Sequence, residues 1–301
     1  MSFLPVRRNE MQTQKNKNLR ALVATALVVA VVGIFPVDAA AIAIVRQDQP
    51  GTGSLTPLQL KIEKQRVRLG SAEQEERRDA VSQLGAMHHP DASRAAVFAL
   101  KDSSASVRAT AASSILALPR DESVINLIPL LSDKDEFVRR EAAYALGKTR
   151  GNNAVGPLID RLLTDKQDAV RGAAAVALGE ISDASAVAAL AAVISSQAGV
   201  AGSKKNQKSK KEKNPFVLRA AARSLGQIGS PGAVPALIAV LQDEKADDDV
   251  RRESAVALGL IGEPSSLPAL RNVLTARDPY LSRAAHEAVQ KILKSSINNG
   301  R

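Results

Sequence analysis

Six arginines recur through this sequence at intervals of 31, 32, 48, 32 and 32 residues, at positions Arg108, Arg139, Arg171, Arg219, Arg251 and Arg283. A guanidinium group offers five N–H donors in a planar fork, which fits carboxylates, phosphates and carbonyl oxygens. The series therefore fits either a stripe that binds anions or an internal ladder that pairs with acidic residues of adjoining repeats. Acidic residues stand at matching places, namely Asp133, Asp135, Asp165, Asp168 and Asp248. Because stacking requires one arginine per repeat in fixed phase, we favour the structural ladder.

Other groups that could do chemistry are few. The chain has no cysteine, which excludes disulfides, thiolate metal sites and cysteine nucleophiles. Its three histidines are His88, His89 and His286, too few ligands for a buried metal centre, and we interpret them as surface residues. No combination of nucleophile, base and acid is visible in the sequence. The sequence thus predicts no catalytic residue, no metal and no cofactor.

The arginines belong to a repeating pair of helices. Each lies in a segment such as DEFVRREAAYALGKT, whose alanines and leucine recur at the spacing that buries one face of a helix. A second helix follows each segment after a short turn, as in NAVGPLIDRLLTD. The pattern predicts helical hairpins that expose apolar surface on both sides and must cover one another in a stack. A glycine after the leucine either ends the helix or lets a neighbouring backbone approach, at Gly147, Gly179, Gly226 and Gly259.

This pattern resembles HEAT repeats, specifically the subtype named after the phycobiliprotein lyases, with its D…VR-x-x-A-x-x-A-L-G signature. The resemblance covers residues 57–295, with a short tail at 296–301. It implies an all-α fold, an α-solenoid with a right-handed superhelix of about six and a half hairpins. The segments at 55–69 and 291–301 are expected to cap the two ends.

The resemblance also raises enzymatic alternatives. Lyases of this subtype handle bilin chromophores, so a bilin-lyase-like enzyme or an enzyme-associated subunit is our first alternative function. Deoxyhypusine hydroxylase, a HEAT-like di-iron enzyme, uses repeated His-Glu pairs, whereas this chain has a single pair at His286 and Glu287. HEAT-like DNA glycosylases grip DNA with basic and aromatic side chains, but aromatics make up only 2% of this chain and form no stacking series. We therefore predict that nucleic acid is not a partner.

The N-terminal residues have the order of an export signal. A basic segment ends at Arg20, an uncharged apolar run occupies 21–35, and small residues follow. This order predicts a secretory signal peptide within 1–43, a linker at 44–56, and a periplasmic or extracellular location.

The alternative for the same segment is an uncleaved membrane anchor at 21–45. It would bury Asp38 at a cost of roughly 3 kcal/mol, and its uninterrupted apolar run is short for a membrane span. In both cases the solenoid is expected to lie outside the cytoplasmic membrane.

The net charge of +10 comes mainly from the N-terminal segment and from an insertion at 197–214, so the rest of the chain is nearly balanced. The insertion is rich in lysine, serine and glycine and cannot form a packed core, so we predict that it is disordered. A loop that binds an anionic envelope polymer or lipid surface is our second alternative function, and a solvated loop without a ligand is the plainer interpretation. Its lysines are Lys204, Lys205, Lys208, Lys210, Lys211 and Lys213.

The leading hypothesis is an exported, non-catalytic protein that binds a protein or peptide along its concave face. Second helices of HEAT stacks commonly line that face, so exposed residues that vary among the second helices are our candidates for partner contact. These are Asn126, Asp160, Arg161, Arg271 and Asn272. We expect the protein to be a monomer.

Overall fold

The chain divides into two units, Met1–Ser54 and Leu55–Arg301. The computed structural model describes residues 55–195 and 212–299, all in the second unit. The predicted signal peptide, linker and membrane anchor, and residues 197–211 of the insertion, therefore lie outside the described residues. Within the described ranges every regular element is a helix, which confirms the predicted all-α solenoid.

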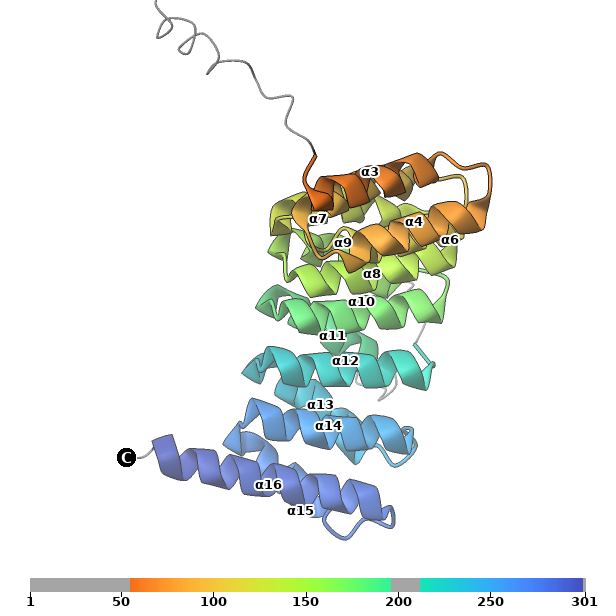
Figure 1. The fold of residues 1–301 in the computed structure, drawn as a ribbon. Coiled ribbons are helices and arrows are strands. Elements are labelled where there is room, and N and C mark those ends of the chain that lie inside the picture. The colour runs from red at the N-terminus through yellow and green to blue at the C-terminus, as the bar shows by residue number, and fades with distance from the viewer. Residues whose placement is uncertain (1–54, 196–211, 300–301) are drawn as a thin grey trace, which may run out of the picture. The chain divides into compact units, whose positions relative to one another are not determined.

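The helices lie in two rows. The first row stacks one helix below another in Figure 1: α4 (Gln74–Ala86), α6 (Ala105–Ser114), α8 (Glu136–Thr149), α10 (Asp168–Ile181), α12 (Pro215–Ile228), α14 (Asp248–Ile261) and α16 (Pro279–Asn299). The second row alternates with it along the chain: α5 (Pro90–Ala96), α7 (Arg120–Leu127), α9 (Val155–Thr164), α11 (Val187–Ser195), α13 (Val234–Gln242) and α15 (Leu267–Asn272). The first described helix, α3 (Pro57–Leu69), packs against α4 and α5 and caps the stack.

Short 3-10 helices complete the second row. Two of them continue the helix before them: η1 (Val97–Lys101) follows α5, and η2 (Ile128–Ser132) follows α7. Four others lead into the helix after them: η3 (Asn152–Ala154), η4 (Ala184–Ala186), η5 (Pro231–Ala233) and η6 (Pro264–Ser266).

Side-chain caps begin some of the first-row helices, including α8 and α12, and left-handed residues end those from α8 to α14. The Asp135 carboxylate accepts a hydrogen bond from the Phe137 amide at 2.9 Å, and Asn214 accepts one from the Phe216 amide at 2.9 Å. Such caps satisfy amides that have no partner inside the helix. The first-row helices from α8 to α14 end at residues with positive φ, namely Arg150, Ser182, Gly229 and Gly262.

Small residues let the first-row helices pack very closely. A Cβ atom added to Gly147 would lie 2.8 Å from the Cα of Ala177, and one added to Gly226 would lie 2.8 Å from the Cα of Ala257. No side chain fits in that space. Of the two roles predicted for these glycines, the structure shows the close approach, because the helices end about three residues later.

The first row forms the inner side of the stack. Its neighbouring helices contact each other more extensively than those of the second row do. A stack of hairpins curves toward the row in which the helices lie closer together. We had expected the second helices to line the concave side, but the structure gives that side to the first row. We call the solvent-facing stripe of α8, α10, α12, α14 and α16 the inner face.

Candidate functional site

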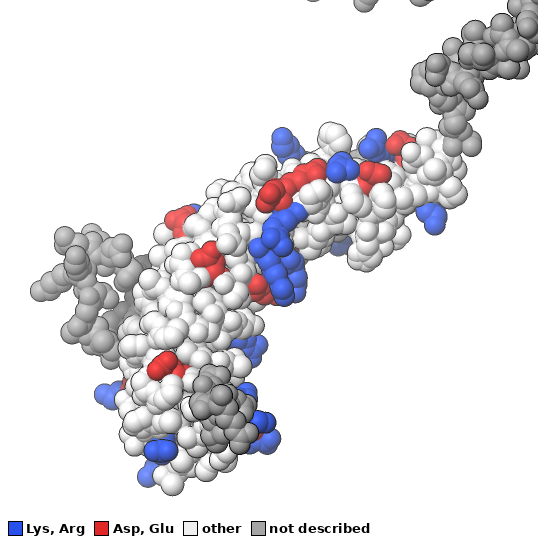
Figure 2. Space-filling view, turned by 90° about the vertical axis from the view of Figure 1, so that its left-hand side faces the viewer, with Lys and Arg blue, Asp and Glu red and all other residues white. Residues whose placement is uncertain are grey.

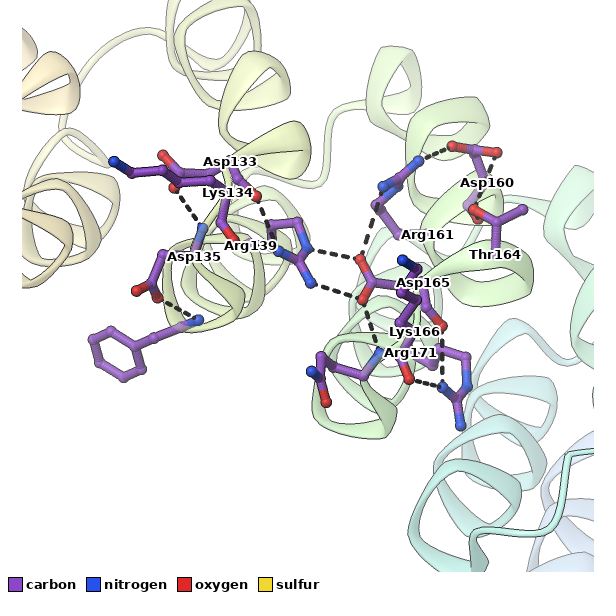
Figure 3. A network of polar contacts seen from close by, with 12 residues as sticks. Asp133, Lys134, Asp135, Arg139, Asp160, Arg161, Thr164, Asp165, Lys166 and Arg171 are labelled. Carbon is purple, nitrogen blue, oxygen red and sulfur yellow. Dashed lines mark hydrogen bonds and ion pairs between the residues drawn. The ribbon is translucent and has the colours of Figure 1, made fainter.

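The arginine ladder runs along the edge of the stack where the first-row helices begin (Figure 3). Arg139 on α8 donates two hydrogen bonds to the carboxylate of Asp165, at 2.8 and 3.0 Å. Its remaining terminal nitrogen donates to the carbonyl oxygens of Asp133 and Lys134, at 2.9 and 3.4 Å. Arg139 thus joins the end of the preceding second-row helix to the end of the next one.

Three other arginines make the same set of contacts. Arg108 donates to Asp133 and Arg171 donates to Glu212, in each case from two nitrogens. Arg77 on α4 does the same with Asp102. We keep the name ladder for Arg77, Arg108, Arg139, Arg171 and their carboxylate partners Asp102, Asp133, Asp165 and Glu212.

The carboxylates of the ladder also begin the next repeat. Asp165 accepts a hydrogen bond from the Gln167 amide at 3.0 Å, just before α10. Burial disfavours its ionised form, but the hydrogen bonds from Arg139 and from that amide outweigh this effect and lower the pKa of Asp165. The side chain of Asp165 is only 2% exposed and that of Arg139 is 13% exposed. These groups are saturated with protein partners, so the ladder is structural and leaves little room for an external anion.

The structure places two of the predicted ladder arginines elsewhere. Arg219 and Arg283 have exposed side chains and pair with Asp249 at 3.4 Å and with Glu287 at 2.9 Å. The reason is register: a ladder arginine stands eight residues before the repeat glycine, as Arg139 does before Gly147. Arg219 stands seven residues before Gly226. The repeat of Arg283 has no such glycine, but Arg283 stands five residues after Asp278, whereas Arg139 stands four residues after Asp135. This shift of one residue turns both side chains to the inner face.

The position relative to the repeat glycine also accounts for Arg77, which the arginine spacing did not identify. Arg77 stands eight residues before Gly85 and belongs to the ladder, although its repeat is the weakest copy. In α12 the ladder position is Leu218, which is fully buried. Arg251 has the correct register, but it donates to the carbonyl oxygen of Leu241 and pairs with Asp248 at 3.6 Å. Counting back from each glycine would have identified all of these from the sequence.

Some of the exposed large apolar side chains lie on the inner face, while others, such as Phe98 and Ile125, lie on the second row. Phe137 is 42% exposed, Phe216 is 41% exposed and Tyr280 is 68% exposed, and each stands at the first turn of its helix. Val256 and Leu260 add aliphatic surface on α14. Large exposed apolar side chains that share one face are a usual mark of an interaction surface.

Each aromatic ring of the inner face is held by a neighbour. The guanidinium carbon of Arg140 lies 4.7 Å from the centre of the Phe137 ring, and that of Arg252 lies 5.2 Å from the Tyr280 ring. The Phe216 ring lies over Gly172 of α10, where an added Cβ would come within 2.0 Å of it. These contacts hold the rings in place before any partner arrives.

The predicted partner-binding residues lie on the second row, not on the inner face. The Asn126 amide is half-buried and donates to the Glu122 carbonyl oxygen at 2.7 Å. Asp160 and Arg161 pair with each other beside Asp165, as Figure 3 shows. Arg271 and Asn272 are exposed at the end of α15. A role for these residues in binding stays a prediction.

The three histidines lie at the surface or at a helix start. His88 and His286 are exposed, and Nδ1 of His89 accepts a hydrogen bond from the Asp91 amide at the start of α5. Among the described residues, no group of three or more His, Cys, Asp or Glu side chains could hold a metal ion, and no helix is long and apolar enough to span a membrane.

The described residues include only the end of the lysine-rich insertion. All predicted polyanion-binding lysines except Lys213 lie outside the described residues. Positive and negative side chains are interspersed with uncharged ones on the face seen in Figure 2. The charge balance expected for the body of the chain agrees with this view.

The two rows, the glycine contacts and the ladder recur with the period of a known repeat. A family model for HEAT repeats matches residues 96–179, 126–201 and 207–290, which together exceed half of the chain. The chain belongs to the HEAT-repeat family. The ladder arginines and the glycines thus form the structural framework of a HEAT solenoid, and the inner face is the surface that this framework presents.

One solved structure supports this fold, and two others show a weaker similarity. The YibA protein of Escherichia coli is 19% identical, with 97% of this chain and 99% of that chain covered and a TM-score of 0.53. The complex of CpcE and CpcF of phycocyanin lyase from Nostoc sp. PCC7120 is 20% identical, with coverage of 87% and 100% and a TM-score of 0.46. Human deoxyhypusine hydroxylase is 20% identical, with coverage of 77% and 84% and a TM-score of 0.40. At these identities the similarity extends to the fold alone. None of the curated proteins matches the sequence.

Proposed function

We propose that this HEAT-repeat protein is a non-catalytic binding protein that holds a protein or peptide against its inner face. The observation that carries the proposal is the row of exposed, pre-positioned aromatic side chains at Phe137, Phe216 and Tyr280. Leaving large apolar side chains in water has no structural benefit for a solenoid whose core is already filled by alanine, leucine and valine. A partner that covers these rings would remove them from water.

The charged groups support a binding role over a catalytic one. The ladder arginines and carboxylates are occupied by one another, so they offer no free acid, base or anion site. The arginines of the inner face are accessible and stand beside the aromatic rings, which is the composition of interface anchors.

We also propose that the protein acts outside the cytoplasmic membrane. The support is the order of basic, apolar and small residues within 1–43. Fractionation of cells followed by N-terminal sequencing tests this proposal and separates cleavage from anchoring. A mature protein that starts near Ala41 and is recovered in the soluble envelope fraction supports export, whereas an intact N-terminus in the cytosol overturns it.

Site-specific photo-crosslinking in the native host tests the binding role. A photoreactive residue in place of Phe216 lies on the inner face, and the same residue in place of Leu163, which is 47% exposed on α9, lies on the second row. Both positions tolerate a bulky side chain at their exposed edges. We expect a discrete adduct of one partner from the Phe216 position and none from Leu163. Equal labelling at both positions, or labelling at Leu163 only, would overturn the proposal.

A further inference from the structure

Aromatic and arginine residues form a repeated pair on the inner face. In α8, α12 and α16 an aromatic residue is followed three residues later by an arginine, which places both on one helix face. We call these three pairs the dyads: Phe137–Arg140, Phe216–Arg219 and Tyr280–Arg283. They stand on every second helix of the first row.

The helices between the dyads carry different residues at the same positions. On α10 these are Ala169 and Gly172, and the Gly172 backbone supports the Phe216 ring. On α14 they are Asp249 and Arg252, and Arg252 covers the Tyr280 ring. The intermediate helices therefore support the rings of the dyads and add no ring of their own. The dyads therefore recur once in every two repeats.

The arginines of the dyads are open to a ligand. The side chain of Arg219 is 45% exposed and makes one contact with the exposed Asp249, at 3.4 Å. Arg283 is 79% exposed and pairs with Glu287 within its own helix, and Arg140 pairs with the adjacent Glu141. Exposed pairs of this kind contribute only about 0–1 kcal/mol, so an incoming carboxylate can replace them at little cost. The ladder arginines, in contrast, have bidentate buried partners and two carbonyl contacts.

The spacing of the dyads selects the kind of ligand. Packed helices lie about 8–10 Å apart, so dyads on alternate helices lie roughly 16–20 Å apart. An extended peptide advances about 3.3 Å per residue, so this distance corresponds to about five or six residues. An interval of six returns to the same side of an extended chain, because its side chains alternate.

We infer that the inner face recognises an extended acidic peptide segment in which an apolar and an acidic side chain recur about every six residues, one pair for each dyad. The apolar side chain covers the aromatic ring and the carboxylate pairs with the arginine. This inference rests on the proposed function and adds its ligand class and register. Single-stranded nucleic acid fits less well, because the aromatic rings are too far apart for successive bases to stack on them.

A binding experiment with the full-length protein tests the predicted interval between the recognised side chains of the peptide. The probe is a set of fluorescent peptides of equal length and composition, in which a leucine and an aspartate recur at four, five, six, seven or eight residues. Fluorescence anisotropy should show the tightest binding at six, with at least a tenfold loss at four and at eight. Equal binding across the set, or a maximum at another interval, overturns the inference.

Substitutions of Arg219 test whether this arginine pairs with a carboxylate of the peptide. Arg219→Ala should weaken the best peptide about tenfold, which is about 1.4 kcal/mol. The matched control is Arg94→Ala, which removes the same charge from a similarly exposed, ion-paired site on α5 of the second row and should leave binding unchanged. Arg219→Glu should lose binding and regain it with a peptide that carries lysine in place of its middle aspartate. Equal effects of R219A and R94A, or no rescue of R219E, count against the pairing, and circular dichroism establishes that each variant is folded.

Two further outcomes separate the inference from the proposed function. If the Phe216 position crosslinks to a partner while all the peptides fail to bind, the register is wrong and the binding role stands. If both experiments fail, the inner face is not the binding surface. Preferential binding of a single-stranded oligonucleotide that R219A abolishes would replace the peptide with nucleic acid.

Discussion

The repeats before the lysine-rich insertion and those after it stack in the same way, but different polar contacts join them. From α4 to α10 the ladder is continuous, and each arginine has a bidentate carboxylate in the next repeat. From α12 to α16 it is interrupted: Leu218 takes one arginine position and Ala276 takes one carboxylate position. Ion pairs across the inner face join the helices there instead, such as Arg223 with Glu253 at 3.0 Å.

The polar contacts between repeats change at the insertion. Its last described residues rejoin the framework, because Glu212 supplies the carboxylate that an aspartate supplies elsewhere, and it also accepts hydrogen bonds from the Lys213 and Asn214 amides. The difference teaches that the glycine contacts recur on both sides of the insertion, whereas the ladder is continuous only before it. In α12 and α16 the arginine stands one residue past the ladder position, and its side chain lies on the inner face.

Breaking the continuous part of the ladder should have the largest effect. Arg139→Ala leaves the Asp165 carboxylate, which is 2% exposed, without its bidentate partner and with only the longer contact to Arg161 at 3.8 Å. Removing one member of a buried ion pair costs about 3–5 kcal/mol. We expect a loss of about 3 kcal/mol in the free energy of unfolding, measured by urea denaturation, with faster amide hydrogen exchange in α8 and α10.

Arg219→Ala is the matched control, because it removes an arginine of the same row whose ion pair is exposed. Its expected loss is less than about 1 kcal/mol. If R139A and R219A destabilise the protein equally, the division between buried ladder and exposed inner face is wrong.

The glycine contacts should matter equally on both sides of the insertion. Gly147→Ala and Gly226→Ala each force a Cβ to within 2.8 Å of the next helix backbone, and overpacking of this kind costs about 1–3 kcal/mol. Thermal denaturation should show the same loss for both variants. Gly156→Ala is the control, because its added Cβ meets nothing within 4 Å and alanine favours a helix. A much smaller loss for Gly147 than for Gly226 would show that the complete ladder compensates for poor packing.

The fold was predictable from the sequence because its causes are local and repeated. Alanine and leucine at helical spacing, a glycine after the leucine and an aspartate between hairpins recur within about 32 residues of one another, so each copy checks the others. The same repetition predicted three of the four ladder arginines: Arg108, Arg139 and Arg171.

The candidate site was less predictable, because it depends on a register of one residue. Arg219 lies next to the ladder position in sequence, but one residue turns a helical side chain by about 100° and moves it to another face. The sequence pattern alone also could not show which row of helices forms the concave side. That choice follows from how closely Gly226 meets Ala257, which is a property of two helices far apart in the sequence.

Completing an interrupted ladder contact should have the smallest effect and is the sharpest test of why the two regions differ. In α14, Arg251 has the ladder register and a side chain only 12% exposed, but Ala276 stands where an aspartate would meet it. Ala276→Asp should provide that carboxylate and raise the free energy of unfolding by about 1 kcal/mol, the usual net value of a hydrogen-bonded pair. The gain should disappear in the Arg251→Gln background and should be smaller for Ala276→Asn, which has the same shape without the charge. Equal gains for aspartate and asparagine would mean that helix capping, not the arginine, is what the later repeats lack.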